Sequence, residues 1–187
     1  MDTFSTPRLT AEKLQEVHLP DLAALHLDPD VARHLGGIRT RDVTQGYITT
    51  SLTHWERYGF GLWALKTTSG EFAGRAGLRH VTVEGVPEIE VAYAFRRELW
   101  GQGLATEIAA AIVRIGFEQL RLPALVGLVS IENIASRRVL ERCGFHVERA
   151  LHYKDEAVVL FRKTAWLSRS AVRTGPFQAG PPPCITD

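Results

Sequence analysis

A glycine turn at Gly101-Gln102-Gly103 and a carboxylate at Glu90 are the features of this chain whose residue types and spacing could support chemistry. Apolar residues recur at helical spacing from Leu104 onward, so the turn opens a predicted helix. Such a turn leaves backbone N–H groups free at the positive end of the helix dipole, which suits an anion such as a phosphate. Glu90 lies in an apolar, β-prone segment, where a carboxylate is costly unless it is exposed or functional.

The glycine turn does not match the common nucleotide-binding motifs. A dinucleotide fingerprint needs a third glycine, and this chain has Thr106 at that position. A P-loop needs a Gly-Lys-Ser/Thr sequence, which the turn lacks. On its own residues, the turn could also be an ordinary connector between a strand and a helix.

The segments that must position these residues predict one mixed α/β domain with a central sheet of about seven strands flanked by helices. Strands are expected at residues 9–17, 60–66, 72–83, 88–95, 125–129, 145–153 and 157–163. Helices are expected at residues 20–26, 29–35, 41–58, 104–119 and 134–143. We assign residues 1–167 to the domain and the Pro/Gly-rich residues 168–187 to a C-terminal tail.

Composition excludes several classes of protein. The 22 basic and 21 acidic residues nearly cancel, so no direct nucleic-acid binding and no membrane association is expected. Cys143 and Cys184 are the only cysteines, too few for a disulfide framework or a cysteine zinc site. We therefore expect no metal, and a reducing, cytoplasmic location.

Three segments together resemble the Gcn5-related N-acetyltransferase (GNAT) family. They are EVAYAF at 90–95, WGQGLATE at 100–107 and NIASRRVLERCGF at 133–145. Within the family they look most like the ribosomal-protein N-terminal acetyltransferases of the RimJ/RimL type, and the resemblance covers about residues 6–163. It implies a splayed sheet with acetyl-coenzyme A (acetyl-CoA) between the strands at 88–95 and 125–129.

The resemblance also implies roles for individual residues. Phe95, through its main chain, and Asn133 match pantetheine contacts, although Asn133 could also be an ordinary N-cap. Ser136 lies near the thioester sulfur in this subgroup. The tyrosine acid of the wider family is replaced here by Leu140, which leaves Ser136 as the candidate to assist the departing thiolate. The pyrophosphate loop falls on the backbone amides of Gly101, Gln102, Gly103, Leu104, Ala105 and Thr106.

Acetyl transfer to an amine needs a base, a polarised thioester carbonyl and a proton route for the leaving thiol. Main-chain N–H groups at 93–95 can meet the charge that develops on the carbonyl oxygen. Glu90 is the candidate general base, directly or through a water, because burial would make its carboxylate a better proton acceptor. Glu88 lies on the same face, but the subgroup's glutamate matches Glu90; an exposed structural role for either remains open.

The acceptor is left open between a protein N-terminal α-amine and a small-molecule amine. An α-amine is neutral more often near neutral pH than a lysine, which slightly favours α-amines. Tyr93, in the active strand, and Trp55 are candidates to line the acceptor site. We expect the acetyl group to pass directly from acetyl-CoA to the amine, and the protein to be a monomer or a homodimer. The alternative function is a non-catalytic or regulatory coenzyme A-binding module.

Overall fold

The computed structural model describes residues 1–154 and 156–165 of the chain. The predicted tail at 168–187 lies outside these residues. Within them, no helix is both long and apolar enough to cross a membrane.

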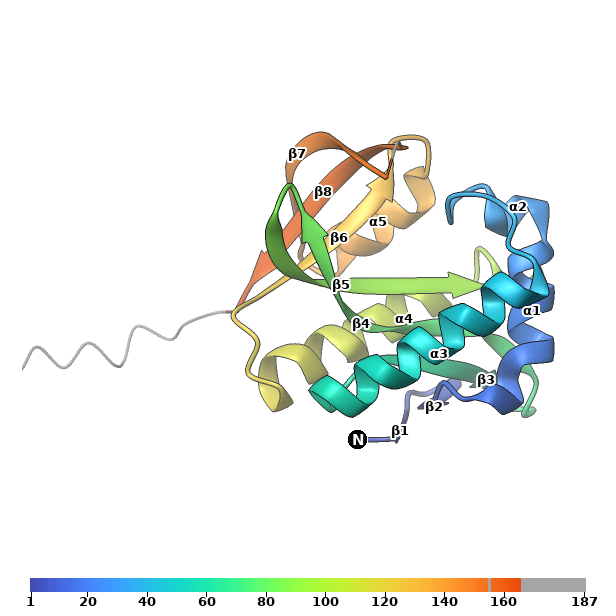
Figure 1. The fold of residues 1–187 in the computed structure, drawn as a ribbon. Helices are drawn as coiled ribbons and strands as arrows, with labels where there is room; N and C mark the ends of the chain where they lie inside the picture. The colour runs from blue at the N-terminus through green and yellow to red at the C-terminus, as the bar shows by residue number, and fades with distance from the viewer. Residues whose placement is uncertain (155, 166–187) are drawn as a thin grey trace, which may run out of the picture.

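The described residues form one open, mixed sheet of eight strands in the order β1-β2-β3-β4-β5-β6-β8-β7 (Figure 1). All neighbouring strands are antiparallel except β5 and β6, which are parallel. The strands are β1 (Thr3–Ser5), β2 (Leu9–Lys13), β3 (Leu62–Thr67), β4 (Phe72–Val83), β5 (Val86–Phe95), β6 (Ala124–Ser130), β7 (His146–Tyr153) and β8 (Glu156–Thr164).

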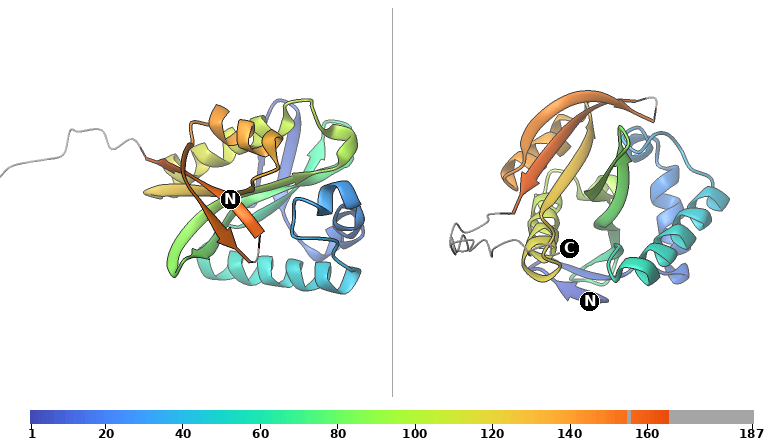
Figure 2. Two further views of the ribbon diagram at one scale, coloured as in Figure 1. Left: turned by 90° about the horizontal axis from the view of Figure 1, so that it is seen from above. Right: turned by 60° about the vertical axis from the view of Figure 1, so that its left-hand side comes forward.

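Helices cover both faces of this sheet. Those before β3 lie on one face, and α4 and α5 lie on the other (Figure 2). The helices are α1 (Leu19–Leu27), α2 (Pro29–Ala32), α3 (Arg41–Tyr58), α4 (Leu104–Arg114), which continues as a π-helical turn (Ile115–Gln119), and α5 (Ile134–Arg142). The fold class predicted from the sequence is confirmed.

Two hydrophobic clusters attach the helices to opposite faces of the sheet. Ile48 of α3 and Leu22 of α1 pack with Ala92 and Ala94 of β5. On the other face, the helical stripe of α4 that includes Ile108 packs with the alternate residues of β5. β5 is therefore the central strand to which both layers are fixed.

Several predicted boundaries shift. The first predicted strand, 9–17, ends at Lys13, because residues Glu16–His18 turn into a 3-10 helix that leads into α1. The helix expected at 29–35 ends at Ala32. The sheet has eight strands because β1 pairs with β2 at the sheet edge. A three-residue strand is too short to show a recognisable alternation of apolar and polar residues.

The pairing of β5 with β6 is limited to one point. Glu90 lies opposite Val126, and beyond this pair the two strands diverge (Figure 1). Because β5 stays paired with β4 along its whole length, from Val86 to Phe95, it is the β6 side that opens. The splayed sheet implied by the sequence resemblance is present.

Candidate active site

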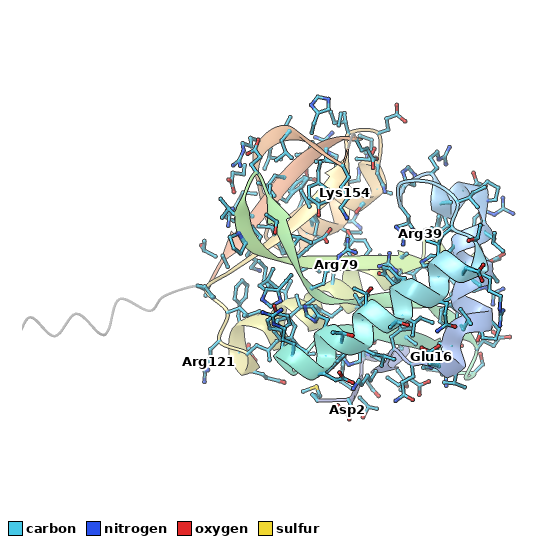
Figure 3. All side chains as sticks on the ribbon, viewed as in Figure 1. Asp2, Glu16, Arg39, Arg79, Arg121 and Lys154 are labelled. Carbon is cyan, nitrogen blue, oxygen red and sulfur yellow. The ribbon has the colours of Figure 1, made fainter. Side chains whose placement is uncertain are left out.

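A cleft of about 720 Å³ lies where β5 and β6 diverge. Its walls come from β5, the glycine turn, the end of β6, α5 and the segment that follows α2. Figure 3 marks three cations of its lining, Arg39, Arg79 and Lys154, which come from separate segments around the opening. The cleft brings together most of the site residues predicted from the sequence: Glu90, Tyr93, Phe95, Gly101, Gly103, Leu104, Ala105, Thr106, Asn133 and Ser136.

The glycine turn presents an uncapped helix N-terminus to this cleft. Gly101 and Gly103 have φ angles of 75° and 79°, in the left-handed region that only glycine enters without strain. Gly103 is the N-cap of α4 and offers no side-chain cap, so the first-turn N–H groups remain available to an anion. Gln102 is not part of the cleft lining, and its side chain donates back to the carbonyl of Glu98.

The turn is held in place by the loop between β1 and β2, which sequence reasoning missed. Arg8 donates from Nη1 to the carbonyl of Gln102 at 2.8 Å and from Nε to Glu107 Oε2 at 2.7 Å. The hydroxyl of Thr6 donates to Glu107 Oε1 at 2.6 Å. Burial alone would raise the pKa of Glu107, but the hydrogen bonds from Thr6 and Arg8 outweigh it and hold that pKa below its ordinary value. The first turn of α4 thus carries a carboxylate whose charge Arg8 offsets.

Phe95 has part of its main chain already engaged. The indole N–H of Trp100 donates to the carbonyl of Phe95 at 2.9 Å. This bond folds the chain back after β5 and fixes the strand end relative to the glycine turn.

Glu90 forms an ion pair with Arg79 that the sequence alone does not reveal. Its side chain is only 7% exposed, and Arg79, directly opposite on β4, donates from Nε to its Oε2 at 2.6 Å. The carboxylate raises the pKa of Arg79, so this guanidinium stays charged. The sequence predicts a carboxylate buried among apolar residues, whereas the structure places the guanidinium of Arg79 directly against it.

Glu88 is separated from this chemistry. It shares a face with Glu90, as predicted, but Arg162 of β8 binds both of its oxygens, at 2.6 and 3.1 Å. It does not line the cleft. Of the two acids on β5, Glu90 is therefore the one with access to a bound molecule.

Tyr93 and Ser136 meet across the cleft. The Tyr93 hydroxyl lies 2.8 Å from Ser136 Oγ and donates to the Ser136 carbonyl at 3.1 Å. Burial raises the pKa of Tyr93, against the opposing effect of its hydrogen bond to Ser136, so the phenol stays protonated. Leu140 stands on α5 at the position where the resemblance leads one to expect a tyrosine, and the phenol that reaches the cleft comes from Tyr93 of β5.

Asn133 acts as the N-cap of α5. Its Oδ1 accepts from the backbone N–H of Ser136 at 3.0 Å, which fixes the first turn of the helix. The two readings of Asn133 from the sequence, a cap and a cleft residue, are compatible, because it also lines the cleft.

Leu140 of α5 packs closely on β6. It is 1% exposed, and a Cβ added at Gly127 would lie 2.3 Å from Leu140 Cδ1. The glycine therefore lets α5 approach the strand that forms one wall of the cleft.

Trp55 does not lie where it was predicted. It is 5% exposed, packs edge-to-face on Trp63 with ring centroids 5.1 Å apart, and is not part of the cleft lining. Its indole N–H donates to the carbonyl of Leu62 at 3.0 Å. A Cβ on Gly61 would lie 2.6 Å from the indole, so the glycine makes room for Trp55 in the core. Trp55 is a packing residue.

Sequence reasoning also missed Arg75 and Arg39 in the lining. A signal was present for Arg75, since a cation in the mostly apolar β4 is as unusual as the carboxylate at Glu90. Among residues 1–154 and 156–165, no group of three or more His, Cys, Asp or Glu side chains could hold a metal ion.

Known proteins share both the sequence and the fold. FsC-acetyl coenzyme A-N(2)-transacetylase of Aspergillus fumigatus is 33% identical over 163 residues, which cover 82% of this chain and 69% of that protein. An acetyltransferase from Agrobacterium tumefaciens is 29% identical with a TM-score of 0.78, covering 87% of this chain and 94% of the other.

At lower identity the likeness shows the fold alone. RimL, a ribosomal L7/L12 alpha-N-protein acetyltransferase solved in complex with coenzyme A, is 17% identical with a TM-score of 0.73, covering 87% of this chain and 98% of the other.

A family model described as an acetyltransferase (GNAT) domain matches residues 8–146. The chain thus belongs to the GNAT family of acetyltransferases.

Proposed function

We propose that this protein transfers an acetyl group from acetyl-CoA directly to a primary amine of a small molecule or of a protein N-terminus. The observation that carries the proposal is that the uncapped N-terminus of α4, Glu90 and the Tyr93–Ser136 pair all line one cleft. The relationship to the RimJ/RimL subgroup, a cytoplasmic location and a monomeric or homodimeric state remain part of the proposal.

The residues of the cleft fit coenzyme A. Its pyrophosphate requires free N–H donors, which the glycine turn and the first turn of α4 supply. Its pantetheine arm carries amide groups, and the side of β5 that faces the gap has backbone groups to match. The bound thioester supplies the activated acetyl group.

Glu90 and Tyr93 divide the proton transfers between them. The amine nitrogen forms a bond to the acetyl carbonyl carbon, and the carbon–sulfur bond breaks. Glu90, held by Arg79, accepts the proton that the amine loses, directly or through a water. On the other side, the protonated Tyr93 hydroxyl, joined to Ser136, donates to the departing thiolate.

Cys143 gives no support for a route through an acetyl-cysteine. It is buried and does not line the cleft. Burial raises the pKa of its thiol, so the nucleophilic thiolate is scarce at neutral pH. Direct transfer between two bound substrates fits the site better.

The experiment is a measurement of free thiol released from acetyl-CoA across a panel of amines and short peptides, for the wild type and for Glu90→Gln. The proposal predicts amine-dependent release, reduced about 10²-fold or more in the variant. In parallel, coenzyme A should raise the melting temperature of both proteins. Release at the background rate with every amine, with the melting temperature still raised, would favour a coenzyme A-binding module without catalysis.

A further inference from the structure

Arg75 of β4 brings a positive charge into the cleft wall, and no carboxylate of residues 1–154 and 156–165 forms an ion pair with it. It is 2% exposed and lines the cleft. Within residues 1–154 and 156–165, its Nε and Nη1 have no hydrogen-bond partner. A buried guanidinium in that condition is costly, so it calls for a functional explanation.

Arg39 brings a second guanidinium to the same place. It lies in the segment between α2 and α3, and its Nη2 donates to the carbonyl of Leu35 at 2.6 Å. Its Nη1 is buried and has no partner in the part of the chain that the structure describes. The guanidinium groups of Arg39 and Arg75 lie 5.3 and 5.1 Å from the centroid of the same Tyr47 ring. Two segments far apart in sequence thus converge on one position.

Among the residues that the structure describes, no acidic side chain of the lining forms an ion pair with Arg39 or Arg75. Glu90 is already paired with Arg79. Glu156 raises the pKa of His34, although burial outweighs this effect and the pKa of His34 is lowered. His26, whose ring packs edge-to-face on Tyr47, has its pKa lowered to about 3 by burial and by the two arginines, so it adds no charge at neutral pH. In the described residues, the cations of the lining are Arg39, Arg75, Arg79, Arg138, Arg142 and Lys154, against the carboxylates Glu90 and Glu156.

The arginines lie on the side of β5 where an acceptor would approach Glu90. In the register of β4 and β5, Arg75 is opposite Ala94 and Arg79 is opposite Glu90, so these four side chains share one face. Ala92, between them on β5, also lines the cleft. The uncapped N-terminus of α4 packs against the other face. The pair Arg39 and Arg75 is therefore separate from the position proposed for the coenzyme pyrophosphate.

We propose that the acceptor amine carries an anionic group, and that Arg39 and Arg75 bind this group while Glu90 faces the amine. The inference rests on the proposed acetyl transfer and specifies its substrate class. A guanidinium matches a carboxylate or a phosphate with two parallel hydrogen bonds, and here two guanidiniums are available. The preferred acceptors are small amines with an acidic group near the nitrogen, such as amino acids, and polycationic amines are disfavoured by like charge.

The first test compares acceptors matched in shape but different in charge. Rates of acetyl transfer are measured for amino acids and their amides, for phosphoethanolamine and for spermidine. The acid should exceed its amide in kcat/KM by about tenfold or more, and spermidine should be a poor acceptor. Amino acids and phosphoethanolamine distinguish a carboxylate from a phosphate as the bound group. An amide or spermidine that matches or exceeds the acids would overturn the proposal.

The second test uses variants. Arg75→Gln and Arg39→Gln should each lower the acid-to-amide ratio of kcat/KM about tenfold while transfer to the amide persists. Arg33→Gln is the matched control, because Arg33 is an exposed arginine of the same segment outside the cleft. It removes the same charge and should leave the ratio unchanged. An equal fall in all three variants would contradict binding at Arg39 and Arg75.

Coenzyme A binding separates failure of this inference from failure of the proposed function. If coenzyme A does not raise the melting temperature of the wild type, the proposed function itself is wrong. If coenzyme A binds but no amine is acetylated, N-acetyl amino acids and their amides are compared as ligands in the presence of coenzyme A. Binding of the acids alone, abolished in Arg39→Gln, supports the anion site, and equal binding of acid and amide overturns it. Arg39 is less buried than Arg75, so its variant serves if Arg75→Gln does not fold.

Discussion

The hydroxyl of Tyr93 on β5 lies 2.8 Å from Oγ of Ser136 on α5, so a hydrogen bond joins two walls of the cleft that strand pairing leaves apart. Asn133 fixes the Ser136 end of this bond by capping α5. The phenol is therefore held toward the place where a leaving thiol would depart in the proposed reaction.

We expect Tyr93→Phe to lower kcat about 10²-fold with little change in the binding of coenzyme A, because the ring stays in place and only the proton donor is lost. Ser136→Ala should lower kcat less, and the double variant should resemble Tyr93→Phe, since both residues serve one proton route. Steady-state rates and coenzyme A titrations provide the measurement.

The pH profile gives an independent check on Tyr93. Burial raises its pKa above the ordinary value of 10.0, so the donor form persists through the working pH range. The wild type should show no loss of rate from Tyr93 between about pH 6 and about pH 9. An alkaline fall in that range that disappears in Tyr93→Phe would contradict the assignment.

The Glu90–Arg79 pair should be coupled in stability. Arg79→Met leaves Glu90 buried without its cation and should lower the free energy of unfolding by about 3 kcal/mol. Glu90→Gln should cost less, about 1 kcal/mol, because a third of the Arg79 side chain reaches solvent. The double variant should recover part of the summed loss. Denaturant unfolding of the four proteins measures the coupling, and strict additivity would show that the pair does not interact.

The tether from Thr6 and Arg8 to Glu107 should be sensitive to acid. Because the hydrogen bonds keep the pKa of Glu107 below its ordinary 4.5, its stabilising contribution is fully present above that pH and is lost as the pH falls through the lowered value. The melting temperature of the wild type should exceed that of Glu107→Gln by a constant margin near neutral pH, and the margin should shrink in acid. Glu118→Gln, at an exposed position, should show no such change. A margin that is the same in acid would exclude this role of the carboxylate.

Gly127→Ala should disturb the cleft through α5. The new methyl group would meet Leu140 at 2.3 Å, so the helix or the side chain must move, at a cost of about 1–3 kcal/mol. Because α5 carries Asn133 and Ser136, the KM for acetyl-CoA should rise as well. Adding Leu140→Ala should restore part of the coenzyme affinity by making space. If the double variant binds no better than Gly127→Ala, the effect is not transmitted by this contact.

Local patterns in the sequence were enough to locate the glycine turn, Glu90 and the cap at Asn133. Each is defined by neighbours within a few residues: a periodic helix after the turn, an apolar strand around the carboxylate, and a helix start after the asparagine. The apolar periods also placed α3 at its observed bounds, with Thr40 as its N-cap and Gly59 in the left-handed conformation at its end.

What the sequence could not supply were partners brought together by the fold. Tyr93 and Ser136 are 43 residues apart, and Arg8 and Glu107 are 99 residues apart, so no periodicity links them. The observed position of Trp55 differs from the predicted one for a related reason. An aromatic residue on the apolar stripe of a helix fits a core or a pocket equally well. Here Gly61 leaves the space in which the Trp55 indole packs in the core.

The single pairing of Glu90 with Val126 has a consequence for how the molecule unfolds. Beyond this pair, the described parts of β5 and β6 have no common ladder, so the β1–β5 and β6–β8 portions of the sheet meet at one register position. A bound molecule with its own amide groups would extend that junction as a surrogate strand. We expect amide hydrogen exchange on both strands past the pair to slow when coenzyme A is added, while the β4–β5 ladder is already protected. The ligand would then add a backbone link between two portions of the sheet that the hydrophobic cluster under α4 already joins.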